Sequence, residues 1–130
     1  MKVNEIMSFP AITEDGEASI AIILKHMEQS RIGGVVITKE GKPIGIIVDH
    51  DIAAKVILKD RSPDEVKAKE IMSSPLITVG SDASVEEASG LLARKGIRRL
   101  PVVEGDTLVG IISIRNILTG ESVPVRKYLS

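Results

Sequence analysis

Cysteine and tryptophan are absent from this sequence of 130 residues, and aromatic residues make up only 2% of it. Without cysteine, neither a disulfide framework nor a thiolate metal site can form. One Phe and one Tyr provide no series of aromatic surfaces on which the bases of a single-stranded nucleic acid could stack. The core must therefore be built from Ile, Val, Leu, Met and Ala.

An excess of charge of one sign is also missing, and so are long apolar runs. Lys and Arg number 17 against 18 Asp and Glu, so the net charge of -1 gives no indication of a nucleic-acid partner. The apolar runs are too short to span a membrane, and the first residues lack the apolar core of a signal peptide. Together with the lack of cysteine, these absences favour a cytoplasmic globular protein.

The main positive feature of the sequence is an internal repeat with an offset of 65 residues. Ile-Met-Ser at 6–8 recurs at 71–73, and Gly-Ile-Ile at 45–47 recurs at 110–112. Fifteen of the 52 residue pairs at this offset are identical, without a gap. Because a unit of about 50 residues is too small to bury a good core alone, we expect the two copies to pack as one pseudo-symmetric pair.

Each copy shows the same order of predicted elements, β-α-β-β-α. Apolar residues in the first helix of the first copy, from Ile20 to Met27 and including Leu24, recur at helical spacing. In the second copy, Ser84 and Glu87 form a capping-box motif that marks the helix start. Two β-branched runs joined by a turn follow, and then a second helix. The expected segments are extended pieces at 11–13 and 76–78, strands at 35–37, 44–48, 100–103 and 108–112, and second helices at 51–59 and 114–118.

Together these motifs resemble the CBS domain, a family whose members usually occur as tandem pairs. The matching pieces are Ile-Met-Ser-x-Pro in each copy, Ile-Arg-Arg-Leu-Pro-Val-Val at 97–103 and Gly-Ile-Ile-Ser-Ile-Arg-Asn-Ile at 110–117. The resemblance implies an α/β (α+β) fold in which two pseudo-symmetric β-α-β-β-α units pack through their sheets. The predicted domains are a first unit at 1–60, a linker at 61–66, a second unit at 67–120 and a C-terminal tail at 121–130.

The resemblance also implies a function. CBS pairs bind adenosine-containing ligands such as AMP, ADP, ATP or S-adenosylmethionine in clefts between the copies. They regulate a neighbouring enzyme, channel or transporter domain, and they often form homodimers shaped as a disc of four units. We therefore expect a regulatory, nucleotide-sensing module that is not an enzyme and requires no cofactor. Its expected partners are a second copy of the chain and an unidentified regulated protein.

The family's ribose site is a Gly-h-Ser/Thr-x-x-Asp motif, and the two copies depart from it differently. The first copy keeps the acid as Asp51 but has Val48 in place of the hydroxyl, whereas the second keeps the hydroxyl as Ser113 but has Asn116 in place of the acid. Hydrogen bonds to a carboxylate are about twice as strong as neutral ones, so Asp51 is the predicted ribose anchor. The alternative is that these residues only cap helices, which Ser, Asp and Asn do without any ligand.

Two adjacent arginines, Arg98 and Arg99, precede a strand of the second copy, and at least one of them is predicted to bind a ligand phosphate. A guanidinium offers phosphate a planar fork and never deprotonates. The alternative is a solvated edge, or an ion pair with an acid. The first copy has Gly33 and Gly34 at these positions, which allow close approach of the backbone. The preferred cleft would combine Asp51 with an arginine of the other copy.

Apolar residues near the strand starts are expected to contact the adenine. These residues are Ile12, Ile32 and Val35 in the first copy and Ile77, Ile97 and Leu100 in the second. For Val35 and Leu100 a plain core position is the favoured interpretation. Thr13 and Thr78 complete the predicted ligand-binding residues.

No metal site or catalytic constellation is predicted. His26 and His50 share no repeated spacing with acidic residues, and His26 is expected on the solvated flank of a helix. The sequence has no nucleophile elbow and no phosphate loop. The remaining alternative is a protein-interaction scaffold with vestigial nucleotide sites, which the two incomplete ribose motifs favour.

Overall fold

The computed structural model describes residues 1–123 and 125, and these residues form two compact units. The first-repeat unit comprises Ile12–Leu76, and the second-repeat unit combines Met1–Ala11 with Ile77–Val125. Of the tail predicted at 121–130, residues 124 and 126–130 lie outside the described part of the chain.

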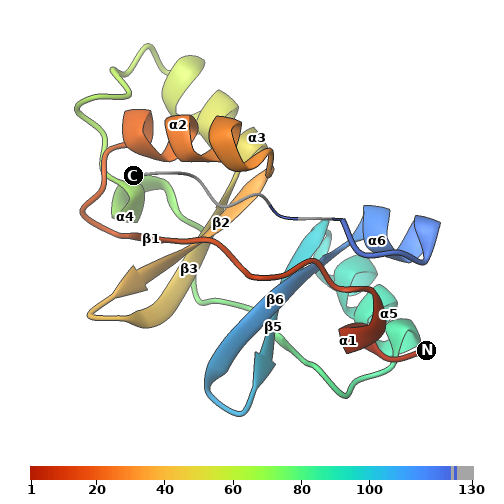
Figure 1. Ribbon diagram of the computed structural model, residues 1–130. Coiled ribbons are helices and arrows are strands. Elements are labelled where there is room, and N and C mark those ends of the chain that lie inside the picture. The colour runs from red at the N-terminus through yellow and green to blue at the C-terminus, as the bar shows by residue number, and fades with distance from the viewer. Residues whose placement is uncertain (124, 126–130) are drawn as a thin grey trace. The chain divides into compact units, whose positions relative to one another are not determined.

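The first-repeat unit is built on a three-stranded sheet of order β1-β2-β3 (Figure 1). Strand β1 runs parallel to β2, and β2 pairs with β3 as an antiparallel hairpin. The hairpin turn is Glu40-Gly41, both with positive φ, as a two-residue turn of this kind requires. The elements are β1 (Thr13–Asp15), α2 (Ile20–Ser30), β2 (Gly34–Lys39), β3 (Lys42–Val48), α3 (Asp49–Ile52), the π-helix η1 (Ala53–Ile57) and α4 (Ala68–Ile71).

The second-repeat unit has the same construction, with sheet order β4-β5-β6 and the same strand directions. The predicted α/β class and the β-α-β-β-α order of each repeat are therefore confirmed. The first strand of each repeat begins later than predicted, at Thr13 and Val79. The elements are α1 (Val3–Ile6), β4 (Val79–Gly80), α5 (Val85–Lys95), β5 (Arg99–Glu104), β6 (Thr107–Ser113) and α6 (Ile114–Thr119).

The long helices α2 and α5 begin and end with matching local signals. Ser19 and Ser84 are their N-caps, and each Oγ accepts a backbone N–H of the first turn, at 3.2 and 3.0 Å. Such a bond satisfies one of the N–H groups that a helix start leaves unpaired. Both helices end at a left-handed residue, Arg31 (φ 54°) and Gly96 (φ 63°).

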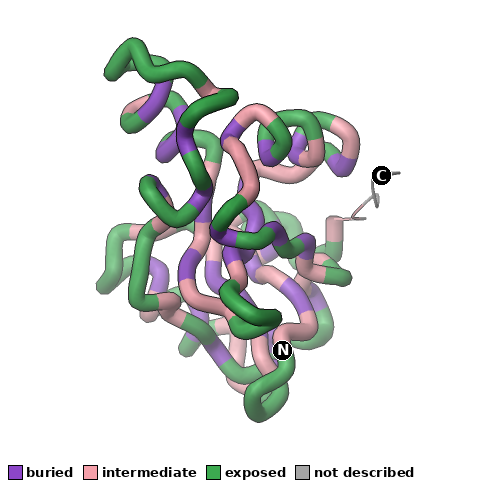
Figure 2. The backbone as a smooth tube through the Cα atoms, turned by 90° about the vertical axis from the view of Figure 1, so that its left-hand side faces the viewer, coloured by how far each residue is buried: buried purple, intermediate pink, exposed green. Residues whose placement is uncertain are grey.

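The core of each unit is aliphatic, as the composition predicts, and it lies along the strands and the inner helix faces (Figure 2). Val35 and Leu100 are fully buried, so the core interpretation of these two residues is confirmed. The apolar stripe of α2 is narrower than predicted, because Ile20 and Met27 are buried whereas Leu24 is 37% exposed.

Each repeat supplies its opening segment to the sheet of the other repeat. Ser8 and Ile111 exchange two backbone hydrogen bonds of 2.8 and 2.9 Å in the second-repeat unit. Ser73 and Ile46 make the equivalent pair of 2.9 and 3.1 Å in the first-repeat unit. The short helices α1 and α4 belong to these opening segments and were not predicted. The compact units therefore follow boundaries that differ from those of the repeats along the chain.

Ion pairs also attach the segment of α4 within the first-repeat unit. Glu17 Oε2 lies 2.7 Å from Lys67 Nζ, and Glu17 Oε1 lies 2.6 Å from Lys69 Nζ. The hydrogen bonds from Lys67 and Lys69 lower the pKa of Glu17 from 4.5 to about 2. All three side chains are exposed, so salt screens these pairs and their contribution to stability is small.

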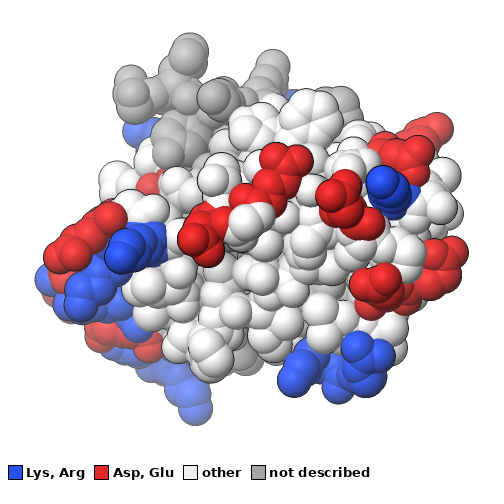
Figure 3. Space-filling view, turned by 90° about the horizontal axis from the view of Figure 1, so that it is seen from below, with Lys and Arg blue, Asp and Glu red and all other residues white. Residues whose placement is uncertain are grey.

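The face shown in Figure 3 carries both Lys and Arg side chains and Asp and Glu side chains. Among the described residues, no helix combines the length and apolar character needed to cross a membrane.

Two equivalent glycines make room for the opening segments. A Cβ on Gly45 would lie 2.7 Å from Met72 Sδ and 2.8 Å from Ser73 O. A Cβ on Gly110 would lie 2.7 Å from Ser8 O, with a methionine Sδ at 2.8 Å. Because backbone oxygens cannot move aside cheaply, glycine is required at both positions.

Replacing Gly110 with alanine is expected to lower the free energy of unfolding by about 1–3 kcal/mol, since the added methyl overpacks the contact with the opening segment. Urea denaturation followed by circular dichroism measures this. Gly80→Ala is the matched control, because a Cβ at Gly80 has no neighbour within 4 Å. Equal stability of the two variants would contradict the assigned packing.

Candidate functional site

The first candidate site is the junction between β3 and α3, called here the first junction (residues 48–51). The backbone of Gly34 on β2 is in register with Val48, the last residue of β3. Asp49 N donates to Gly33 O at 3.0 Å, which ties the start of α3 to the start of β2. The structure therefore brings Gly33, Gly34, Val48 and Asp51 together, as the sequence predicts.

Asp51 is a buried carboxylate with unused hydrogen-bonding capacity. Its Oδ2 accepts the Val48 N–H at 2.9 Å, and its Oδ1 lies 3.3 Å from Lys55 Nζ. Lys55 Nζ also donates to Ile71 O at 2.9 Å, so its position is fixed from two sides. A carboxylate offers about four acceptor sites, and neighbours in the described structure occupy two of them. Asp51 can accept further hydrogen bonds, and it is only 8% exposed.

The second candidate site is the junction between β6 and α6, called here the second junction (residues 113–116). Arg99 on β5 is in register with Ser113, and Ile114 N donates to Arg98 O at 3.0 Å. The predicted residues Arg98, Arg99, Ser113 and Asn116 therefore also lie together, in the second-repeat unit.

Asn116 uses its full hydrogen-bonding capacity within this unit. Its Oδ1 accepts from Ser113 N at 2.8 Å and from Ser113 Oγ at 3.0 Å. Its Nδ2 donates to Ser8 Oγ at 3.2 Å and to Glu121 O at 3.1 Å. Two backbone groups fix the orientation of the amide, because an N–H must face Oδ1 and a carbonyl must face Nδ2. An amide has two donor hydrogens and two acceptor lone pairs, so none is left for a ligand.

Ser113 acts as the N-cap of α6. Its Oγ accepts the Asn116 N–H at 3.2 Å while Asn116 Oδ1 accepts from Ser113, which makes a reciprocal capping box. Capping, the alternative considered from the sequence, therefore accounts for both polar side chains of the second junction.

The two predicted phosphate-binding arginines have no acidic partner in the described part of the chain. Arg98 is exposed and Arg99 is half-buried at the start of β5. Their guanidinium groups can therefore bind an anion without first breaking an ion pair. Asp51 lies in the other compact unit, so its predicted cooperation with an arginine stays a prediction.

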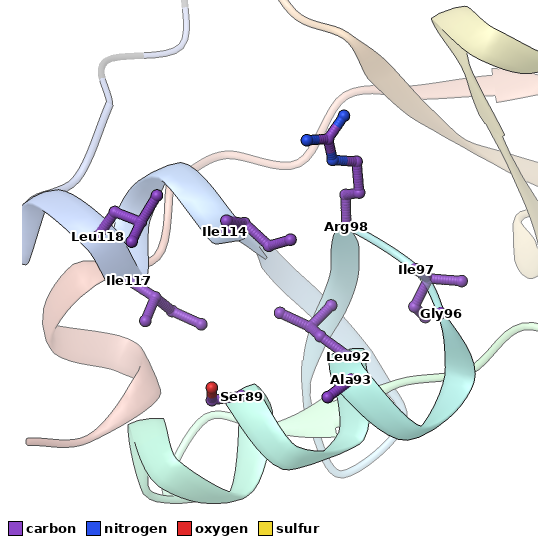
Figure 4. A pocket seen from close by; sticks show the side chains of 9 residues that line it. All are labelled: Ser89, Leu92, Ala93, Gly96, Ile97, Arg98, Ile114, Ile117 and Leu118. Atoms are coloured by element: carbon purple, nitrogen blue, oxygen red, sulfur yellow. The ribbon is translucent and has the colours of Figure 1, made fainter.

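A shallow cavity of about 440 Å³ opens beside Arg98 in the second-repeat unit (Figure 4). Helices α5 and α6 supply most of its wall, which is largely apolar, and Ser89 contributes a hydroxyl. In the first repeat the residue corresponding to Ser89 is Leu24, and a glycine on this wall, Gly96, corresponds to Arg31. At two other wall positions the second repeat has the larger side chain, with Arg98 in place of Gly33 and Leu118 in place of Ala53.

The remaining predicted ligand contacts are spread over different environments. Ile12 is buried and its carbonyl accepts the Val36 N–H at 3.0 Å, so it belongs to the sheet. Ile32 is half-buried next to Gly33, whereas Thr13 is exposed. In the second-repeat unit Thr78 is exposed, and both Ile77 and Ile97 are half-buried.

The prediction that His26 is solvated is wrong. His26 Nδ1 contacts Glu14 Oε1, and their side chains are 16% and 8% exposed. Glu14 lies on β1 and His26 on α2, so only tertiary packing brings them together. The corresponding residues of the second repeat are Val79 and Leu91. A comparison of the two repeats at these positions would have shown that a polar pair replaces an apolar one.

Transplanting the apolar pair into the first repeat tests the Glu14–His26 contact. His26→Leu alone is expected to cost about 1–3 kcal/mol, because it leaves a buried carboxylate without its imidazole partner. Adding Glu14→Val should recover most of that loss, since apolar replacements of buried polar pairs are often neutral or stabilising. Urea denaturation of both single variants and the double variant gives the coupling energy. Additive losses would show that the two side chains do not depend on each other.

The described residues include no group of three or more His, Asp or Glu side chains placed to hold a metal ion. His50 is exposed at the start of α3.

A family model for the CBS domain matches residues 3–57 and, separately, residues 68–121. The chain therefore belongs to the CBS domain family and contains two copies of the domain. This result confirms the resemblance that the repeated motifs suggested.

Two relatives match most of this chain. MK0525 of Methanopyrus kandleri is 42% identical over 123 residues, which cover 93% of this chain and 63% of the relative. MJ0653 of Methanocaldococcus jannaschii is 43% identical over 116 residues, which cover 89% of this chain and 60% of the relative. The chain thus spans about six-tenths of the length of these relatives.

Two solved structures resemble the whole fold. The CBS domain pair of protein MJ0100, in complex with 5′-methylthioadenosine and S-adenosyl-L-methionine, is 31% identical with a TM-score of 0.82 over 92% of this chain and 96% of that chain. A hexameric CBS-CP12 protein from bloom-forming cyanobacteria is 35% identical with a TM-score of 0.85 over 91% of this chain and 69% of that chain.

Proposed function

We propose that this chain is a regulatory module that binds an adenosine-containing ligand, with Asp51 as the ribose anchor. The observation that carries the proposal is the buried carboxylate of Asp51, which keeps acceptor capacity that the described residues around it do not use. A structure with 31% identity to this chain contains 5′-methylthioadenosine and S-adenosyl-L-methionine, and both of these carry the ribose hydroxyls that such a carboxylate binds.

The other residues of the first junction support a nucleoside. Gly33 and Gly34 carry no side chain, which lets a ligand approach the backbone closely. Ile32, which is half-buried next to Gly33, provides apolar surface for a base. If the ligand carries phosphate groups, as in AMP, ADP or ATP, the predicted contacts are the guanidinium groups of Arg98 and Arg99, which make no ion pair with any described acidic residue. The predicted position of the ligand between the two copies belongs to this proposal.

The proposed output is a change in a partner protein, without catalysis by this chain. A ligand shifts an equilibrium between two states only by the difference in its affinity for them. The identity of the regulated protein and a cytoplasmic location stay predictions. The competing function, an interaction scaffold without ligand, is favoured by the saturated amide of Asn116. A partner protein whose affinity for this chain does not change when nucleotides are added would support the scaffold function.

A ligand panel tests the proposed function. At a concentration of about 100 times Kd, a ligand adds about 2.7 kcal/mol of stability. At least one of S-adenosylmethionine, 5′-methylthioadenosine, AMP, ADP and ATP should therefore raise the melting temperature by roughly 5–10 °C. Asp51→Asn should weaken binding about tenfold, because the hydrogen bonds lose charge assistance while the amide oxygen can still accept the Val48 N–H.

The matched control is Asp49→Asn, which removes an exposed neighbouring charge and should leave the affinity within about twofold. Isothermal titration calorimetry measures both variants. Absence of heat and of a thermal shift across the panel would refute the proposed function, and equal losses in the two variants would refute the role of Asp51.

We further propose that the chain forms a homodimer through the helical side of the first-repeat unit. Ile22 and Leu24 on α2 are 45% and 37% exposed, Ile57 at the end of η1 is 54% exposed and Leu58 after it is 77% exposed. Four exposed large apolar side chains on or directly after the helices of one unit are more than scattered single positions need, and exposed apolar surface is typical of association sites. The family resemblance predicts that a second molecule of this chain covers this apolar surface.

Size-exclusion chromatography with light scattering tests the dimer. Wild-type protein should elute at twice the mass of one chain, and Leu58→Glu should shift it to the monomer by placing a charge in the apolar contact. Lys59→Glu is the control, since Lys59 is exposed and already polar. A wild-type monomer at micromolar concentration would contradict the proposal.

A further inference from the structure

The chain turns back onto the second junction immediately after α6. Gly120 ends this helix in the left-handed conformation, with φ of 68°, and its N–H donates to Asn116 O at 2.8 Å. The next three residues, Glu121–Val123, are called here the return segment. Thr119 Oγ1 accepts the Glu121 N–H at 3.3 Å, which supports the reversal of the chain.

Three further hydrogen bonds hold the return segment in place. Glu121 O accepts from Asn116 Nδ2 at 3.1 Å, and Val123 N donates to Ser8 Oγ at 3.2 Å. Ser122 Oγ donates to a backbone carbonyl of the opening segment, Met7 O, at 2.7 Å. The return segment is therefore bound to the same two side chains, Asn116 and Ser8, that bind each other at 3.2 Å.

The first repeat lacks this arrangement. The residue corresponding to Gly120 is Lys55, and here the helical path continues through η1 to Ile57. The residue corresponding to Ser8 is Ser73, which is exposed. Among the described residues, no return segment covers Asp51, and its carboxylate keeps acceptor sites that these residues do not use.

We propose that Asn116 and the return segment close the second junction, so that the chain binds one adenosine-containing ligand and Asn116 is the residue that decides this. The inference rests on the proposed function, since it assumes that a free carboxylate at a junction binds ribose. The amide is essential to closure because it donates to Glu121 O. A carboxylate has no hydrogen to donate and would repel that carbonyl.

Asn116→Asp tests the inference in the full chain, with S-adenosylmethionine, AMP and ATP as the probes. Calorimetry should give one ligand per wild-type chain and two per Asn116→Asp chain. Asn4→Asp makes the same chemical change at an exposed site of the same unit, where only a long, solvent-exposed hydrogen bond to Asp82 (3.5 Å) is lost, and it should leave the number at one. Two ligands on the wild type, or one on Asn116→Asp, would overturn the inference.

Hydrogen exchange of the Val123 amide reports closure without any ligand. Exchange should become at least tenfold faster in Asn116→Asp and should be unchanged in Asn4→Asp. Ser122→Ala should also accelerate it but leave the number of ligands at one, because the amide of Asn116 remains. If the wild type binds no probe, the proposed function fails. Closure is then judged by exchange alone, and an unchanged Val123 rate in Asn116→Asp would overturn it.

Discussion

The docking of each opening segment onto the sheet of the other repeat is the constraint on which both junctions depend. A repeat of about 50 residues cannot bury a sufficient core by itself, and the exchange makes each unit depend on residues from both repeats. The same backbone bonds that join Ser8 to Ile111 also place the Ser8 hydroxyl beside Asn116. A packing requirement of the fold thereby determines the polar surroundings of the second junction.

Much of the fold could be predicted because the duplication gives every local signal twice. The order of helices and strands along the chain, the serine N-cap of α5 and the burial of Val35 and Leu100 all follow from residue type and spacing. The exchange of opening segments could not be predicted in this way. The two segments share Ile-Met-Ser, so the sequence does not indicate which sheet each of them joins.

The candidate sites show the same division between local and tertiary information. The spacing in the sequence is enough to predict that Gly33 and Gly34 lie close to Asp51, because the register of a hairpin and the junction between a strand and a helix are local features. The environment of His26 depends on a contact between a helix and β1, and no local pattern marks it. The amide of Asn116 uses all of its hydrogen-bonding groups only because it also donates to Ser8, which lies more than a hundred positions earlier in the chain.

The second repeat shows what the scaffold itself requires at the position of Asp51. Asn116 Oδ1 accepts the Ser113 N–H at 2.8 Å, just as Asp51 Oδ2 accepts the Val48 N–H at 2.9 Å. An uncharged amide, together with the capping hydroxyl of Ser113, is therefore sufficient to begin the helix after the strand. Burying a carboxylate costs more than burying an amide, and Lys55 is only a partial compensation because it lies 3.3 Å away and is half exposed. A side chain that costs more than the fold requires indicates a role outside folding, and hydrogen bonding to a ligand is the role that its unused acceptor sites fit.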